Sequence, residues 1–244
     1  MPSSRSRRAE LERLGAVPFA HRGLHGGDLV ENSGGAIAAA VARGFGVELD
    51  VQLSRDGEAM VFHDHVLDRL TAAQGPVAAR TAAELQAIRL TIGGEAMPRL
   101  AEALDLIGGR TPLLVELKSP GRQVGRLCAA VAGALQAYSG PAGVMSFNPE
   151  VGGWFARHAP HLLRGLVVTE NGKRGMRGRI ERPFSLWRAR ADFLAYDIRD
   201  LPSSFAEAGR RRGLPVYTWT VRGEADRDRA RAFADQIIFE APPQ

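Results

Sequence analysis

One stretch, residues 47–64, most constrains how this chain can fold. Apolar and polar side chains alternate along its first half, an Asp-Gly pair follows, and a second apolar run leads into His63. Alternation on both sides of an Asp-Gly pair is a strong short-range signal for a β-hairpin. Glu48 and Asp50 leave the first arm on one face, and the turn brings His63 roughly opposite Asp50. Gathering two carboxylates and an imidazole on one face costs free energy, which indicates that they bind a metal or transfer a proton.

The rest of the chain alternates strand-like and helix-like segments, which is the pattern of a parallel α/β fold. Nine strands are predicted, but a parallel crossover needs about a dozen residues and only a tight turn separates the two arms of the hairpin. The second arm therefore pairs antiparallel, as an insertion after strand 2, and eight strands remain for a TIM (β/α)8 barrel. These eight are expected to end at His21, Asp50, Lys118, Phe147, Thr169, Asp197, Thr220 and Glu240.

Length and composition agree with one barrel domain. The 244 residues are 45% hydrophobic, which is ample for a core of that size. We expect a polar N-terminal arm at residues 1–15, with one amphipathic turn, and a single domain at 16–244. No apolar run approaches the ~18 residues of a membrane span, and none follows the basic N-terminus as in a secretory signal. A cytoplasmic location is therefore expected, and the lone Cys128 excludes an intrachain disulfide.

The 32 basic and 27 acidic residues give a net charge of +5. No basic stripe interleaved with aromatic residues is present, so we expect no nucleic-acid partner. The segment 170–190 holds seven Lys or Arg, two Glu, and the large apolar residues Phe184, Leu186 and Trp187. It is expected to be irregular at first and helical from about 184 to 190. A solvated loop and helix explains it most simply, and the alternative is a flap at the barrel mouth that contacts an anionic membrane surface.

Polar residues at the carboxyl ends of TIM-barrel strands point into the active-site mouth. Glu48 and Asp50 alone would suit a solvated face, but Glu116 and Lys118 repeat their spacing on a Val/Leu-rich strand that a barrel buries on both faces. Three carboxylates without a cysteine suit a hard divalent cation such as Ca²⁺ or Mg²⁺. Arg22 and Lys118 supply fixed positive charge for a phosphate, and two histidines beside them indicate an acid and a base. Together these groups indicate phosphoester cleavage.

The remaining histidines and one tryptophan are weaker candidates. Trp219, at the end of a strand, is either a core side chain or a hydrophobic wall of the substrate pocket, and its position favours the pocket. The histidines expected at the surface are His25, His65, His158 and His161.

The motifs that contain these residues resemble those of the glycerophosphodiester phosphodiesterase family. They follow one another in order over about residues 17–242 and comprise His21-Arg22-Gly23, Glu31-Asn32, Glu48-Leu49-Asp50, His63-Asp64, Leu67-Asp68-Arg69-Leu70-Thr71, Met97-Pro98-Arg99-Leu100, Glu116-Leu117-Lys118, Ser146-Phe147 and Thr218-Trp219-Thr220-Val221. The resemblance implies a TIM-barrel enzyme that uses a divalent metal.

By this resemblance each candidate residue receives a role. The metal ligands would be Glu48, Asp50 and Glu116, the acid/base pair His21 and His63, and the phosphate-binding residues Arg22 and Lys118, with Glu31 and Asn32 supporting the site and Trp219 facing the substrate. Some positions depart from the family pattern. Val30 replaces a proline, Arg222 replaces a small polar residue, and Phe239-Glu240-Ala241-Pro242 stands where Thr-Asp/Asn-x-Pro is usual. We expect these changes to affect substrate preference more than the reaction.

Three functions fit these observations. The first, implied by the resemblance, is metal-dependent hydrolysis of a glycerophosphodiester to glycerol 3-phosphate and an alcohol. The second keeps that chemistry with a lysophospholipid as substrate, which the basic, aromatic segment 170–190 would favour. The third is a barrel that binds polyol phosphates without turnover, which would need a missing catalytic group, and none is missing. The sequence leaves open the oligomeric state, and whether water or a substrate hydroxyl is the nucleophile.

Overall fold

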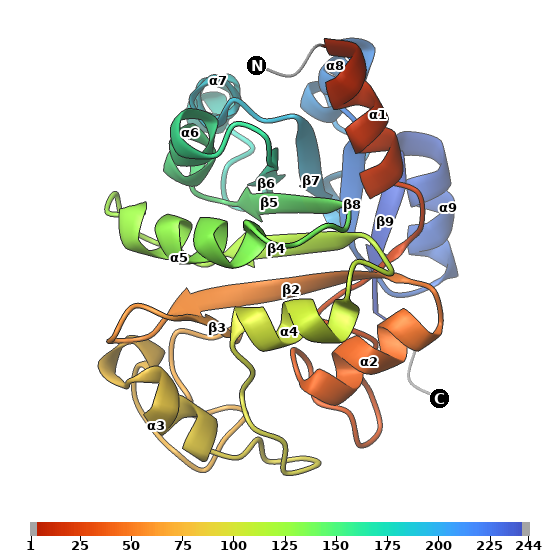
Figure 1. Ribbon diagram of the computed structural model, residues 1–244. Helices are drawn as coiled ribbons and strands as arrows, with labels where there is room; N and C mark the ends of the chain where they lie inside the picture. Colours follow the sequence, from red (N-terminus) through yellow and green to blue (C-terminus); the bar gives the residue numbers. More distant parts are fainter. Residues whose placement is uncertain (1–3, 241–244) are drawn as a thin grey trace.

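The apolar runs of the sequence form one sheet in the computed structural model, which describes residues 4–240. Eight of the described strands lie parallel and close into a barrel, in the order β1-β2-β4-β5-β6-β7-β8-β9, with β9 pairing back to β1 (Figure 1). The predicted TIM barrel is thereby confirmed. The barrel strands are β1 (Phe19–Ala20), β2 (Gly46–Leu53), β4 (Leu113–Leu117), β5 (Ala142–Ser146), β6 (Leu163–Val168), β7 (Phe193–Asp197), β8 (Val216–Val221) and β9 (Gln236–Phe239).

The ninth strand, β3 (Ala59–Val61), pairs antiparallel with β2 as the inserted hairpin that the sequence predicts. Its register pairs Leu53 with Ala59, so the hairpin closes through the five-residue loop 54–58 rather than a two-residue turn. Consequently the Phe62 N–H donates to the Asp50 carbonyl at 3.0 Å. The expected position of His63 opposite Asp50 is therefore wrong by one residue, because His63 comes after the paired part of the arm.

Helices cover the outside of the barrel (Figure 1). They are α2 (Gly34–Ala42), α4 (Leu100–Ile107), α5 (Gly125–Leu135), α6 (Pro149–His158), α7 (Met176–Ala189), α8 (Ser204–Arg211) and α9 (Glu224–Phe233). Helix α3 (Ala82–Ala87) lies instead in the insertion between β3 and β4 and packs in a separate hydrophobic cluster, and single 3₁₀ turns occur at Val77–Ala79 and Ile198–Asp200. Within the described residues, no helix is long and apolar enough to cross a membrane.

Helix α7 begins earlier than the sequence indicates. A helix was expected from about 184, but the structure starts it at Met176. Gly178 and Pro183, two residues that disfavour helix interiors, conceal the helical pattern. A side chain at Gly178 would collide with the carbonyl oxygen of Lys173, so glycine lets the preceding loop fold closely against the helix.

The N-terminal end of the barrel is closed by α1 (Ser4–Leu14), a longer helix than the single turn expected there. Leu14 is fully buried and packs in the barrel interior with Phe193 and Tyr217. Arg7 fastens the helix, donating to Asp192 Oδ1 at 3.0 Å and to the carbonyls of residues 160–162. In Figure 1, α1 lies on the side away from the arrowheads of β2 and β5, so the opposite, carboxyl end is the open mouth.

Candidate active site

Strands β2 and β4 bring three carboxylates together in the barrel. Glu48 and Asp50 are two residues apart on β2, and the register pairs Asp50 with Glu116 on β4. One ligand oxygen from each carboxylate lies within 4.8 Å of the other two, and all three side chains are buried. The structure thus gathers the three carboxylates that the sequence singled out.

The carboxylate cluster is short of positive charge. Burial raises the pKa of Glu48 well above its usual range, and the charges of Asp50 and Glu116 raise it further. Burial also raises the pKa of Glu116, although Lys118 opposes this. For Asp50 the effect of burial is outweighed by Lys118 and Arg22, which hold its pKa below the usual range. Among the described residues, Glu48 Oε1 is buried and has no hydrogen-bond partner. A cluster of carboxylate oxygens that lacks positive charge, and in which one buried oxygen has no hydrogen-bond partner, fits a hard divalent cation.

Two cations flank the carboxylates. Arg22 Nε lies 3.2 Å from Asp50 Oδ2, and Lys118 Nζ lies 2.9 Å from Asp50 Oδ1 and 2.5 Å from Glu116 Oε1. Burial lowers the pKa of Lys118, but Asp50 and Glu116 outweigh it and raise that pKa, so the amine stays charged. Both basic side chains line the cavity at the mouth, where they can bind an anion.

The backbone that carries Arg22 adopts an unusual conformation. Arg22 has a φ of 57°, in the left-handed region that non-glycine residues rarely adopt, and Gly23 has a φ of 78°. A Cβ at Gly23 would lie 2.7 Å from the carbonyl carbon of Ala36, so no larger residue fits there. This turn directs the Arg22 N–H to Glu48 Oε2 at 3.0 Å. The strained residue is therefore one that contacts the carboxylate cluster through its backbone and its side chain.

Glu31 and Asn32 support this arrangement from the loop before α2. Asn32 Nδ2 donates to Asp50 Oδ2 at 3.0 Å, and its Oδ1 accepts from the Asp50 N–H at 3.2 Å. Glu31 Oε1 accepts from Arg22 Nη1 at 2.7 Å. Neither Glu31 nor Asn32 lines the cavity, so both fix the position of other site residues.

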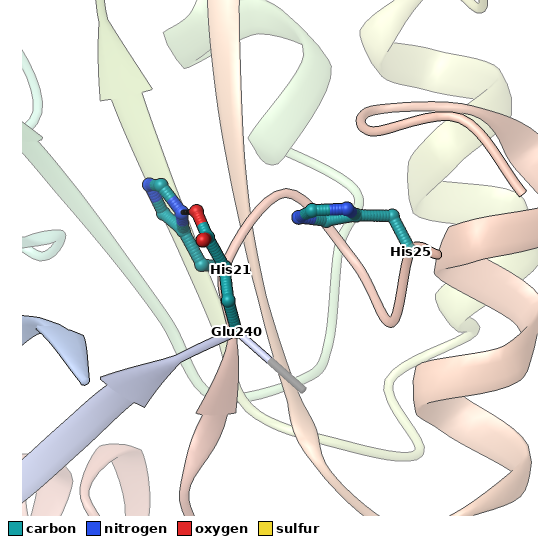
Figure 2. Close-up of side chains that lie close together, drawn as sticks. All are labelled: His21, His25 and Glu240. Carbon is teal, nitrogen blue, oxygen red and sulfur yellow. Dashed lines mark hydrogen bonds and ion pairs between the residues drawn. The ribbon is translucent and has the colours of Figure 1, made fainter. Parts of the chain in front are cut away.

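His21, directly after β1, is hydrogen bonded to a residue at the far end of the chain. Its Nδ1 lies 2.8 Å from Glu240 Oε1 (Figure 2), and Arg222 donates to the same carboxylate from Nε at 2.6 Å and Nη2 at 3.1 Å. The hydrogen bond with His21, together with Arg222, lowers the pKa of Glu240 to about 2 against the effect of burial. Burial lowers the pKa of His21, and Glu240 opposes this. Two separate departures from the family pattern, Arg222 and Glu240, are thus in contact with each other.

His63 has the same kind of support. Its Nδ1 lies 2.6 Å from Asp64 Oδ1, and Arg69 Nε donates to Asp64 Oδ2 at 2.6 Å. Arg69 also donates to both carboxylate oxygens of Glu31. Burial lowers the pKa of His63. Each of the two histidines therefore contacts a carboxylate through Nδ1, and an arginine holds that carboxylate, which leaves Nε2 as the nitrogen that can exchange a proton with a substrate.

A cavity of about 450 Å³ lies beside these groups at the mouth. It is lined by both histidines, both cations, Glu48 and Glu116, and by an aromatic wall. Trp219 Nε1 donates to the Ala195 carbonyl at 2.9 Å, and its ring meets that of Phe147 edge to face with centroids 5.6 Å apart. Phe147 is 46% exposed, so this wall offers apolar surface next to the charged groups.

Sequence reasoning missed several residues that line the cavity, among them two charged residues at and just beyond the end of β7. Asp197 ends β7, is buried, and is bound by Arg199 with Nη2 2.6 Å from Oδ2. A signal for Asp197 was available, because it stands at a predicted strand end where polar side chains point into the mouth. Arg199 carried no such signal, since it lies beyond the strand in a 3₁₀ turn.

His25 does not lie at the surface as expected. It is half-buried, and one ring nitrogen lies within 4.8 Å of ligand atoms on His21 and Glu240 (Figure 2). A tight turn, in which the His25 N–H donates to the Gly23 carbonyl at 3.0 Å, returns the loop toward the site. The other three histidines are exposed as predicted, namely His65, His158 and His161.

Fold and site together define a class of protein. Buried carboxylates that lack countercharge suit a metal, fixed cations suit an anionic ester, and oriented histidines suit proton transfer. On a TIM barrel with these groups at the carboxyl mouth, the class is that of the barrel phosphoesterases.

Comparison with known proteins narrows this class to one family. The model of the Glycerophosphoryl diester phosphodiesterase family matches residues 21–240. A glycerophosphodiester phosphodiesterase of Caldanaerobacter subterraneus subsp. tengcongensis is 29% identical over 239 residues, covering 92% of this chain and 93% of that protein. The chain therefore belongs to the glycerophosphoryl diester phosphodiesterase family, and its enzyme class is glycerophosphodiester phosphodiesterase.

Solved structures share its fold. A phosphodiesterase of Oleispira antarctica, solved in complex with the product sn-glycerol-3-phosphate, matches with a TM-score of 0.79 at 24% identity, over 92% of this chain and 93% of that one. A glycerophosphodiester phosphodiesterase of Thermotoga maritima matches with a TM-score of 0.73 at 22% identity, over 91% and 94%.

Proposed function

We propose that the enzyme hydrolyses glycerophosphodiesters to glycerol 3-phosphate and an alcohol, with a divalent cation and two histidines. The observation that carries this proposal is the placement of three buried carboxylates, within 4.8 Å of one another, beside the Arg22 and Lys118 cations in a cavity shared with His21 and His63. The glycerol 3-phosphate product bound to the Oleispira antarctica enzyme, which has the same fold, supports the substrate class.

Glu48, Asp50 and Glu116 would hold the cation. Carboxylate oxygens without sulfur or nitrogen ligands favour Ca²⁺ or Mg²⁺ over zinc. When bound, such an ion supplies Lewis-acid polarisation of the phosphoryl group. The raised pKa of Glu48 and the unpartnered Oε1 atom are what an ion of this kind would correct.

The protein's own groups would carry the remaining steps. Arg22 and Lys118 bind the phosphoryl oxygens and stabilise the negative charge that grows on them. One histidine takes the proton of the nucleophile, and the other donates a proton to the departing alkoxide. Glu240 and Asp64 keep a proton on Nδ1 of their histidines, so Nε2 is the basic nitrogen of each neutral ring.

The direct test is release of glycerol 3-phosphate from glycerophosphocholine and glycerophosphoethanolamine, detected with glycerol-3-phosphate dehydrogenase. EDTA is expected to abolish release, and Ca²⁺ or Mg²⁺ to restore it. His158→Ala is the control, because His158 is an exposed histidine on α6 that does not line the cavity. Full activity in chelator would contradict the metal site, and no product under any metal would contradict the proposed substrate.

A lysophospholipid is the second candidate substrate, since the aromatic wall of Phe147 and Trp219 offers apolar surface beside the phosphate-binding cations. Comparing kcat/KM for glycerophosphocholine with that for monomeric lysophosphatidylcholine separates the two. Higher kcat/KM for the lipid, lowered by Phe147→Ser but not by Ile92→Ser, would favour this candidate.

Other properties stay predictions. A cytoplasmic location can be tested by cell fractionation, and the absence of a nucleic-acid partner by a gel-shift assay. A single barrel domain from residue 16 onward predicts one cooperative melting transition in calorimetry.

A further inference from the structure

The most exposed large apolar side chains of residues 4–240 lie on one helix, α7. Met176, Ile180, Phe184 and Trp187 are 74%, 67%, 62% and 69% exposed, whereas every other large apolar side chain described is at most 50% exposed. Spacings of four, four and three residues place all four within an arc of about 80° at 100° per residue. We call these four residues the α7 stripe.

Helix α7 packs on the barrel through Gly178, Leu186 and Ala189 and directs its other large apolar residues outward. Gly178 and Ala189 are its buried residues. A side chain at Gly152 of α6 would collide with the Ala189 carbonyl oxygen, so the two helices meet backbone to backbone. Phe184 and Trp187 contact each other, with ring centroids 5.6 Å apart. This is the reverse of an ordinary surface helix, which buries its apolar stripe.

Unpaired positive charge borders the α7 stripe. Four of the seven basic residues of segment 170–190 have a carboxylate partner: Lys173–Glu181, Arg174–Asp200, Arg182–Glu170 and Arg188–Glu150. Both glutamates of the segment are used in these pairs. Arg177, Arg179 and Arg190 have no carboxylate partner within residues 4–240. By helix geometry, Arg177 lies on one side of the stripe and Arg179 on the other.

We propose that the α7 stripe, Arg177 and Arg179 dock the protein on an anionic membrane surface. The apolar side chains would enter the interface between headgroups and acyl chains, and the arginines would contact lipid phosphates. The charge selects this occupant, because an apolar stripe alone would suit any apolar surface, whereas unpaired arginines beside it favour a surface that carries negative charge. A second copy of the chain fits poorly, since a two-fold contact would bring like charges together around the stripe.

Docking through α7 would place the mouth of the barrel near the lipid. The loop 169–175 joins β6 to the start of α7 at the carboxyl end of the barrel. Thr169 Oγ1 donates to Asp197 Oδ2 at 3.1 Å, and Asp197 lines the cavity. The α7 stripe therefore begins beside the mouth, where hydrolysis of a lipid-derived diester would take place. Docking itself uses none of the proposed catalytic residues, so its test is independent of the proposed function.

Vesicle co-sedimentation tests the proposal. The protein is expected to bind phosphatidylcholine vesicles that contain phosphatidylglycerol, to bind pure phosphatidylcholine far less, and to dissociate as salt is raised. The double variant Arg177→Glu/Arg179→Glu is expected to lower the partition coefficient at least about tenfold. Phe184→Ser/Trp187→Ser is expected to abolish binding.

The controls are matched by type and exposure. Ile92→Ser removes an apolar side chain that is 50% exposed outside α7, and Arg212→Glu reverses an exposed charge after α8. Both are expected to bind like the wild type, and melting curves verify that every variant is folded. Equal partition onto neutral and anionic vesicles would overturn the proposal. It would also be overturned if the α7 variants bound vesicles as strongly as the wild type. A dimer that Phe184→Ser/Trp187→Ser dissociates, without vesicle binding, would assign the stripe to a second copy instead.

Discussion

Glu240→Gln tests whether the pair of Glu240 and Arg222 serves the chemistry of His21. The substitution keeps the size of the side chain and removes the charge that lies 2.8 Å from His21 Nδ1. If His21 exchanges a proton during the reaction, its ring is positively charged at one stage, and Glu240 stabilises that stage more than the neutral ring.

The size of the effect follows from the lost interaction. A hydrogen bond between charged groups is worth roughly 1.5–3 kcal/mol, or about 10- to 150-fold in rate. Because Glu240 remains partly exposed and is shared with Arg222, we expect the lower part of this range, about 10- to 50-fold in kcat. KM is expected to change little, since Glu240 is not among the residues that line the cavity.

The assay is steady-state release of glycerol 3-phosphate at saturating metal. Glu240→Asp, which restores a residue usual in the family, is expected to recover part of the loss. Glu224→Gln makes the same chemical change on an exposed side chain of α9 and serves as the control. A kcat for Glu240→Gln within about twofold of the wild type, or a change confined to KM, would refute the role of Glu240 in orienting His21.

Three further perturbations test other parts of the structure. His21→Ala or His63→Ala is expected to lower kcat roughly 10²–10⁴-fold while calorimetric Ca²⁺ binding persists, and near-normal rates would remove the acid/base assignment. The raised pKa of Glu48 means that this side chain binds a proton more tightly in the folded protein than in the unfolded chain, so without metal its own contribution to stability falls as pH rises through and beyond the usual carboxylate range. Metal at ~100 Kd is expected to raise Tm about 5–10 °C, and more at pH 8 than at pH 5, whereas a rise that shrinks with pH would contradict this sign. Arg7→Ala is expected to lower Tm about 3–8 °C by freeing α1, with the exposed Arg8→Ala as an inert control.

Short-range patterns were enough to predict the barrel and the carboxylate cluster. Glu48 and Asp50 repeat at the period of a strand, and Glu116 and Lys118 do the same on the next barrel strand. Parallel strands align their carboxyl ends, so placing these residues on strands also places them together. The hairpin register was one residue off because the Asp-Gly pair sits in a five-residue loop, which sequence alone does not distinguish from a two-residue turn.

Partners that are distant in sequence could not be predicted in this way. Arg222 and Glu240 each stood out as a departure from the family pattern, but nothing in the sequence pairs them or joins them to His21, 219 residues from Glu240. An arginine side chain is long enough to reach many acceptors, and which acceptor it binds depends on what the closed barrel brings near it. Similarly, the exposure of Phe184 and Trp187 depends on which face of α7 packs on the barrel, and Gly178 and Ala189 decide that.

The carboxylates that contact Nδ1 of the two histidines depend on the fold to different degrees. Asp64 is adjacent to His63, whereas Glu240 reaches His21 only because β9 pairs with β1, a strand of two residues. The backbone N–H of His21 also donates to the Phe239 carbonyl at 2.9 Å across the seam, as we call the pairing of β1 with β9. Short strands with few ladder bonds open at lower free energy than the core. We therefore expect low urea to abolish activity before circular dichroism reports unfolding, with amides of β1 and β9 exchanging early in native-state hydrogen exchange. Coincident loss of activity and ellipticity would show instead that the seam is as stable as the barrel.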